Sequence, residues 1–170
     1  MCAAQCRRVP PPSQIAKLRP SAPAQSADAS LTTADQYSVL VVGTDEWAIA
    51  QSAMKVGAAG HQVLLCHDQG EPAFPCNAVR PGRTCPLDQG VHAIVTSRAR
   101  PVDVISPSEV GVVCALHANV PVVVSGISRG APFAAWAAAT VPGQGDLADV
   151  LAQVLTAEGM ATSQASGSAS

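Results

Sequence analysis

Four short apolar runs, separated by segments that carry helix signals, constrain the fold of this chain more than any other feature. Valine, leucine and isoleucine dominate these runs, which lie at residues 38–43, 63–66, 91–96 and 120–125. The runs are continuously apolar rather than alternating, as expected for strands that are covered on both faces. Strands that alternate with helices predict an α/β fold: a small, doubly wound parallel sheet of about four strands, with helices on both faces.

Helix starts can be placed after the first and third runs. Thr44 or Asp45 is suited to cap a helix after the first run, and Gly60 is suited to end it. Ser106 and Glu109 have the spacing of a capping box, and the residue between them at the first helical position is a proline. A second helix is therefore predicted to begin there.

Two further helices are predicted toward the end of the chain. Residues 131–141 are rich in alanine, which favours a helix. Asp146 is suited to cap a last helix. The apolar residues of that helix share one face: Leu147, Val150, Leu151, Val154 and Leu155.

The strand order follows from the handedness of the crossovers. Right-handed connections restrict the order to 2-1-3-4, with the winding reversed between the first and third strands. This order resembles the flavodoxin-like, or more broadly Rossmann-like, architecture, and the resemblance covers the whole folded core. It is a likeness of fold and implies no particular function.

Composition divides the chain into three parts. Residues 1–36 are rich in proline, alanine and serine and lack an apolar period, which predicts a disordered N-terminal arm. Residues 37–159 contain all four apolar runs and are expected to form a single α/β domain. Residues 160–170, dominated by serine and alanine, predict a disordered tail.

Charge and hydropathy argue against several classes of partner. The net charge of −2 argues against a nucleic-acid partner, which needs a basic face. The apolar runs are too short to span a bilayer, and residues 1–36 lack the apolar region of a secretory signal. We therefore expect a cytoplasmic protein with reduced thiols and without a membrane partner, and a homo-oligomer is compatible with the sequence.

Chemically active side chains gather at the carboxyl ends of the predicted strands. In parallel sheets of this kind, ligands bind beyond those ends, near the reversal of winding. Gly43 and Thr44 end the first run, Cys66 and His67 end the second, and Arg98 follows the third. We expect thiol, imidazole and guanidinium groups to converge on this edge.

A small anionic ligand is the first candidate for this edge. Its predicted contacts are Gly43, Thr44, Arg98, Ser125, Gly126, Ser128 and Arg129. Glycines let backbone N–H groups face a ligand at a helix N-terminus, and arginine matches phosphate or carboxylate. The chain has neither the lysine of a P-loop nor a G-x-G-x-x-G fingerprint. An ordinary glycine-containing turn would explain the same residues.

The stretch of residues 66–90 between the second and third runs is unusually long and has no helical period. Compact domains keep such connections when these bind something or are disordered. This one supplies four residues of the two types that zinc prefers, thiolate and imidazole: Cys66, His67, Cys76 and Cys85. Their spacing lacks the close pairs of structural zinc sites. Two interpretations therefore remain. In the first, these residues bind zinc or another thiophilic metal. In the second, Cys66 and Cys114 fill the core, and Cys76 and Cys85 are loop thiols without a specific role.

A thiol-redox protein is a further alternative. Cys76 and Cys85 bracket a short loop that a disulfide could close. Arg80 and Arg83 lie between them and are expected to lower the pKa of the thiols. If the chain is an enzyme, one of these thiols would act as the nucleophile and His67 as its base.

The last alternative is a non-catalytic regulatory or interaction domain. Asp45 and Glu46 resemble the acidic pair of response-regulator receiver domains, which have this architecture. The third run, however, does not end in the phospho-acceptor aspartate of a receiver. The resemblance therefore implies a phosphate-independent relative at most. Trp47, Trp136 and the helix predicted at 131–141 would form an exposed apolar face for a partner or a second copy.

Overall fold

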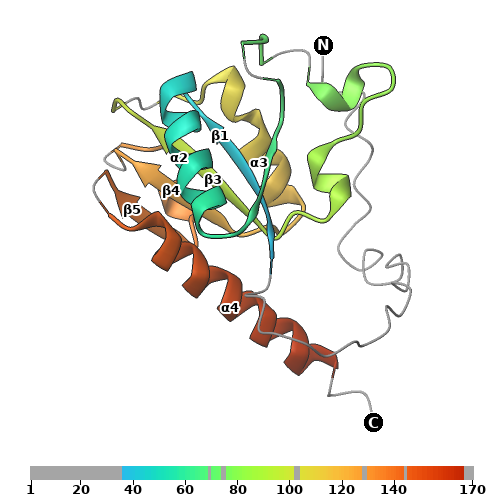
Figure 1. The fold of residues 1–170 in the computed structure, drawn as a ribbon, viewed down its shortest axis with the longest axis vertical. Helices are drawn as coiled ribbons and strands as arrows, with labels where there is room; N and C mark the ends of the chain where they lie inside the picture. Colours follow the sequence, from blue (N-terminus) through green and yellow to red (C-terminus); the bar gives the residue numbers. More distant parts are fainter. Residues whose placement is uncertain are drawn as a thin grey trace. The chain divides into compact units, whose positions relative to one another are not determined.

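One parallel sheet organises the molecule (Figure 1). The computed structural model describes residues 36–68, 70–73, 76–101, 104–127, 130–143 and 145–166. Within them the sheet has five strands: β1 (Ser38–Gly43), β2 (Gln62–Leu65), β3 (Ala93–Arg98), β4 (Val122–Gly126) and β5 (Ala139–Pro142). Their order is β2-β1-β3-β4-β5, and every neighbouring pair is parallel. The predicted α/β sheet and its 2-1-3-4 order are confirmed, with one more strand than expected.

The additional strand lies where the sequence predicts a helix. Residues 131–141 form a 3₁₀ turn at Ala134–Trp136 followed by β5, so the helix prediction is wrong. Helix propensity is a weak preference that tertiary contacts override. Here the open edge of β4 offers unpaired backbone groups, and Val141 of β5 is buried in the core. Pairing along β4 and burial of Val141 therefore outweigh the helical preference of alanine.

Helices cover both faces of the sheet, as predicted (Figure 1). The described helices are α2 (Glu46–Ala58), α3 (Val110–His117) and α4 (Leu147–Ser166). Helix α2 begins at its cap Asp45, whose carboxylate accepts a hydrogen bond from the backbone N–H of Ala48 at 2.8 Å. Helix α4 runs on into the segment 160–170 for which composition predicts a flexible tail.

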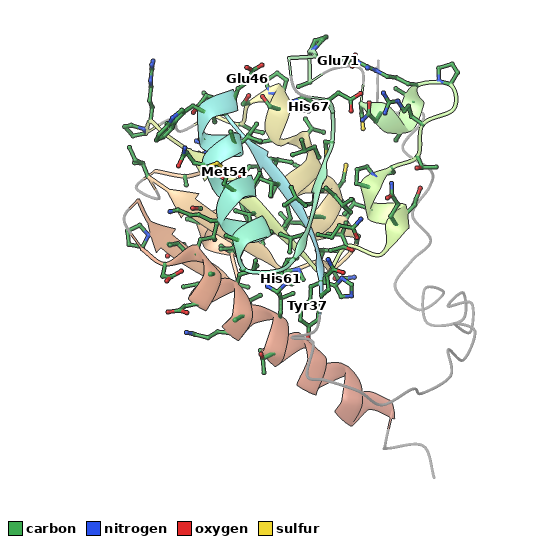
Figure 2. The ribbon with its side chains drawn as sticks, viewed as in Figure 1. Tyr37, Glu46, Met54, His61, His67 and Glu71 are labelled. Atoms are coloured by element: carbon green, nitrogen blue, oxygen red, sulfur yellow. The ribbon has the colours of Figure 1, made fainter. Side chains whose placement is uncertain are left out.

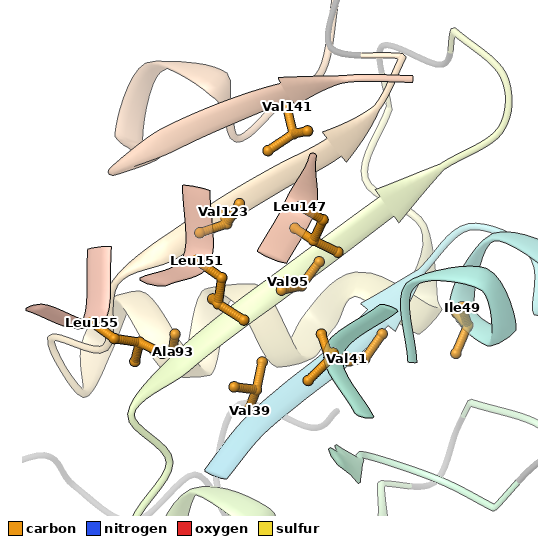
Figure 3. Close-up of a cluster of buried hydrophobic side chains, with 11 residues drawn as sticks. Val39, Val41, Ile49, Ala93, Val95, Val123, Val141, Leu147, Leu151 and Leu155 are labelled. Carbon is orange, nitrogen blue, oxygen red and sulfur yellow. The ribbon is translucent and has the colours of Figure 1, made fainter. Parts of the chain in front are cut away.

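The apolar core consists of two layers, one on each face of the sheet. Alternate residues of β1 divide between them: Val39 and Val41 face α2 and α4, whereas Leu40 and Val42 face α3. Figure 3 shows the first layer, in which the apolar face of α4 packs on the central strands. Strands covered on both faces explain the continuous apolar runs of the sequence. None of the described helices is long and apolar enough to cross a membrane.

Candidate functional site

The β2–β3 connection (residues 66–92) crosses between its strands without an α-helix among its described residues. Two short 3₁₀ turns, Asn77–Val79 and Pro86–Gln89, interrupt it. Pro86 starts the second turn, and Gly90 ends it with a positive φ of 81°, which favours glycine. The connection follows a path of its own instead of packing a helix on the sheet.

Two ion pairs fold the connection back on itself. Arg83 pairs with Asp68 at 2.5 Å, and Arg80 pairs with Glu71. Along the chain, residues 71 and 80 lie between residues 68 and 83. The two ion pairs therefore bring the part of the connection before this loop next to the part after it. Both ion pairs are partly exposed and contribute little stability, but they mark the path of the chain.

Cys66 follows the last residue of β2 and packs into the core layer on the α3 side. Its sulfur lies directly over Gly111 of α3, because a Cβ atom built at Gly111 would come within 2.7 Å of the Cys66 Sγ. The same Cβ would come within 3.2 Å of Val42. The missing side chain at residue 111 therefore provides the space that the Cys66 thiol occupies.

Four cysteines from separate segments influence one another through their charges. The pKa of Cys66 is raised from 9.0 to about 12, mainly by burial and in smaller part by the charges on Cys76, Cys85 and Cys114. We call Cys66, Cys76, Cys85 and Cys114 the thiol cluster. All four are partly buried, and none is in a disulfide.

The expectation that Arg80 and Arg83 lower the pKa of the loop thiols is wrong for Cys85. Burial raises the pKa of Cys85, and a hydrogen bond from the backbone N–H of Leu87 opposes this only in part. Both arginines are instead engaged by the carboxylates of the nested ion pairs. A thiol with a raised pKa is a weak nucleophile near neutral pH because little thiolate is present.

His67 lies at the carboxyl end of the sheet, with Glu46 and Glu71 (Figure 2). It lines a small cavity together with Val41 and Ile49, which belong to the core layer on the α2 side. Cys66 lines the same cavity, and its sulfur packs against Gly111 of α3. The cavity has a volume of about 20 Å³, and a cavity needs roughly 10–15 Å³ to hold one water. It is too small for a nucleotide or a comparable anion.

The predicted zinc ligands are therefore only partly brought together. Cys66 and His67 line the same small cavity, and the charges on Cys76 and Cys85 act on Cys66. Among the residues that the structure describes, no group of three or more histidine, cysteine or acidic side chains is arranged to hold a metal ion. A metal site here would require the thiols to move closer together.

Arg98 does not face an anion at the sheet edge, in contrast to the expectation from sequence. Its side chain has no exposed surface and forms a two-point contact with Glu109, at 2.8 Å through Nε and 2.5 Å through a terminal nitrogen. Glu109 also accepts hydrogen bonds from the Thr96 hydroxyl at 3.0 Å and the Ser106 backbone N–H at 3.1 Å. Arg98 therefore ties β3 to the start of α3.

The other predicted anion contacts meet at strand ends for structural reasons. A Cβ at Gly43 would come within 2.5 Å of the Ser97 carbonyl oxygen, and the Thr44 N–H donates to that oxygen at 3.2 Å. Gly126 has a φ of +94°, and a Cβ there would overlap the Arg98 carbonyl. Ser125 is buried. Both glycines thus permit close approach of neighbouring strand ends.

Two predicted contacts, Ser128 and Arg129, lie outside the described residues.

The acidic pair that resembles a receiver site, Asp45 and Glu46, has a structural role at the start of α2. Asp45 caps α2 through its side chain, as described above, and Glu46 is an exposed residue in the first turn of that helix, where an acid complements the helix dipole.

The opposite edge of the sheet carries Tyr37 and His61 (Figure 2). An open groove of about 380 Å³ lies near the start of β4, between the end of α3 and the turn at Trp136. The indole of Trp136 is 64% exposed, and that of Trp47 on α2 is 67% exposed. Both tryptophans are therefore surface residues, as the interaction alternative requires.

Sequence reasoning placed Cys114 in the core without relating it to Cys66, and it did not single out Gly111. The available signal was their spacing of three residues in a predicted helix, which sets them on one face. Nothing in the sequence showed that this face meets the end of β2. Comparisons give no further guide: no family model, no curated protein and no solved structure matches the chain.

Proposed function

We propose that this chain binds a thiophilic metal ion, with zinc as the leading candidate, through cysteines of the β2–β3 connection. The observation that carries the proposal is that three cysteines lie on one connection that two ion pairs fold back on itself: Cys66, Cys76 and Cys85. Thiolates are the ligands that zinc and softer cations prefer. A reducing compartment such as the cytoplasm would keep these thiols available.

The raised pKa values of the thiols count against a cysteine nucleophile. Burial raises the pKa of Cys66 and of Cys85, so both thiols hold their protons at neutral pH. A reactive cysteine needs the opposite shift. A metal ion displaces protons as it binds, and its positive charge offsets the repulsion between neighbouring thiolates. We therefore favour metal binding over redox chemistry at Cys76 and Cys85.

A small anionic ligand is supported less well. Arg98 is committed to Glu109, while Arg80 and Arg83 are paired with acids. The cavity at the carboxyl edge of the sheet holds about one water by volume. Within the described part of the chain, this edge therefore offers little positive charge and little room for an anion.

The direct test is metal analysis of the full chain purified without added metal, together with titration of its thiols. Cys2 and Cys6 belong to the N-terminal arm by sequence. A Cys2→Ser, Cys6→Ser double variant therefore retains only the four thiols of the cluster, and it serves as the background for these experiments. We expect about one zinc per chain and thiols that react only after chelation. A chain that takes up no zinc, with four equally reactive thiols, would overturn the proposal. Thiols that are lost on mild oxidation and recovered by a reductant would favour the redox alternative.

A second candidate function is an interaction domain. It is favoured by the exposed indoles of Trp47 and Trp136 and by the groove beside the second of these. Light scattering of the full chain separates the cases. A dimer that dissociates on Trp136→Ala, but not on Trp47→Ala, would assign the groove to contacts between copies, whereas a monomer at all concentrations would remove self-association.

A further inference from the structure

We infer that a second copy of this chain pairs with the outer edge of β2, so that the two sheets join across a two-fold axis. The surface is the free side of β2 (Gln62–Leu65), which is the first strand in the order β2-β1-β3-β4-β5. This inference goes beyond the proposed metal site and does not depend on it.

The backbone of β2 divides its hydrogen-bonding groups between two sides. The Gln62 N–H donates to the Tyr37 carbonyl oxygen at 2.8 Å, so Gln62 faces β1. Successive residues of an extended strand direct their backbone groups to opposite sides, so Val63 and Leu65 direct theirs away from β1. Within the described part of the chain, no residue is hydrogen-bonded to these outward groups. The edge of β2 therefore presents two donors and two acceptors to an incoming strand.

These four backbone groups are complementary to themselves. In an antiparallel pair, two opposite residues exchange both of their N–H···O bonds. A two-fold axis at Leu64 sets Val63 opposite Leu65 of the second copy, and Leu65 opposite Val63 of the second copy. Every outward group of both copies then has a partner. Because both copies use the same edge, the interface closes at a dimer.

The side chains of β2 fit the same arrangement. Val63 and Leu65 pack on the core layer of the α2 side, whereas Leu64 packs on that of the α3 side. All three are only partly buried. Pairing sets Val63 against Leu65 on one face and Leu64 against its own copy on the other, and apolar cross-strand pairs stabilise sheets.

The sequence of this edge does not oppose pairing between two copies. Edge strands that avoid pairing carry charged residues or proline. Residues 62–66 contain no acidic residue, no lysine or arginine, and no proline. Two copies can therefore meet along β2 without repulsion between like charges and without a missing backbone donor.

Light scattering of the full chain over a range of concentrations, with a chelator and a reductant present, tests this inference. The additives exclude dimers that are bridged by metal ions or disulfides. We expect a concentration-dependent dimer. Val63→Pro removes the outward N–H of residue 63 without removing a hydrogen bond to β1, so each dimer loses two hydrogen bonds. The dissociation constant of the dimer should rise at least about tenfold. Val63→Thr is the control, because it keeps both the N–H and the branched side chain, and it should retain the dimer.

A monomer at all concentrations would overturn the inference, and so would a dimer that Val63→Pro leaves intact. A dimer that dissociates on Trp136→Ala but not on Val63→Pro would assign self-association to the groove instead. Should Val63→Pro fail to fold, or Val63→Thr also dissociate, amide hydrogen exchange of the unmodified chain decides. The Val63 and Leu65 amides must then exchange more slowly as the dimer forms, and unchanged rates would overturn the inference. The proposed metal site stands or falls separately, by metal analysis.

Discussion

Glu109 is a fully buried acid that accepts four hydrogen bonds near the carboxyl edge of the sheet. Two come from the Arg98 guanidinium, one from the Thr96 hydroxyl and one from the Ser106 backbone N–H. These donors lie on β3 or on the chain that leads into α3. A residue that the sequence marks as half of a capping box therefore also neutralises the buried arginine that was expected to bind an anion.

Removing the charge of Glu109 is expected to destabilise the fold strongly. Glu109→Gln keeps the shape of the side chain but leaves Arg98 as an uncompensated buried charge, which costs about 3–5 kcal/mol. Glu71→Gln is the matched control, because Glu71 pairs with Arg80 at the surface and exposed pairs contribute about 0–1 kcal/mol. Urea unfolding measures both. Equal, small losses would show that the Arg98–Glu109 pair does not hold β3 to α3.

Cys66 makes the stability of the chain depend on alkaline pH. Its pKa is about 12 in the folded state against an ordinary value of 9.0. The unfolded chain therefore ionises this thiol first, and the free energy of unfolding falls as pH rises from 9 toward the folded value. We expect this decrease in the wild type, with a chelator and a reductant present, to exceed that in Cys66→Ala. Parallel pH profiles from urea unfolding would contradict the raised pKa.

At the scale of elements, α3 fits closely over the end of β2. Gly111→Ala is expected to destabilise the fold by about 1–3 kcal/mol through overpacking, because the new methyl group would meet the Cys66 sulfur and Val42. Gly57→Ala in α2 is the matched control. Nothing lies within 4 Å of its new methyl group, so it should stabilise the chain by up to about 1 kcal/mol.

Thermal or urea unfolding distinguishes the two glycine variants by the sign of their effects. Gly111→Ala should also weaken zinc binding, since it displaces the Cys66 sulfur, whereas Gly57→Ala should not. A Gly111→Ala variant as stable as Gly57→Ala, with unchanged zinc affinity, would show that α3 and Cys66 are not in close contact.

The elements differ in how far sequence could predict them. Strands β1 to β4 were predictable because continuous apolar runs have few other uses in a chain of this size. Strand β5 was not, because its alanines prefer a helix and its pairing depends on the free edge of β4. The capping box at Ser106 was visible from local spacing. Short-range sequence signals therefore predicted the strands and the capped helix start correctly. The prediction failed at β5, whose structure depends on pairing with β4.

The candidate site shows the same division between local and long-range information. Cysteines of the connection were visible as candidate ligands, but the approach of Cys114 depends on how α3 crosses the sheet. The burial of Arg98 depends on Glu109, eleven residues away along the chain. Neither relation could be derived from spacing, because each depends on the tertiary arrangement of β3 and α3.

At the scale of the whole molecule, the β2–β3 connection stands out within the doubly wound sheet. Its described residues include cysteines but no crossover α-helix. A helix would pack on the sheet through its own apolar face. The β2–β3 connection has two 3₁₀ turns and two surface ion pairs instead. A metal ion held by the cysteines of this connection would supply some of the order that a packed helix otherwise provides.

X-ray absorption spectroscopy at the zinc edge, on the full chain in the Cys2→Ser, Cys6→Ser background loaded with zinc, tests the central claim most directly. The account predicts sulfur neighbours at about 2.3 Å, supplied by the cysteines of the β2–β3 connection. Cys85→Ser should remove one of these sulfur neighbours. A shell of nitrogen and oxygen atoms, or a zinc spectrum identical to that of the hydrated ion, would contradict it.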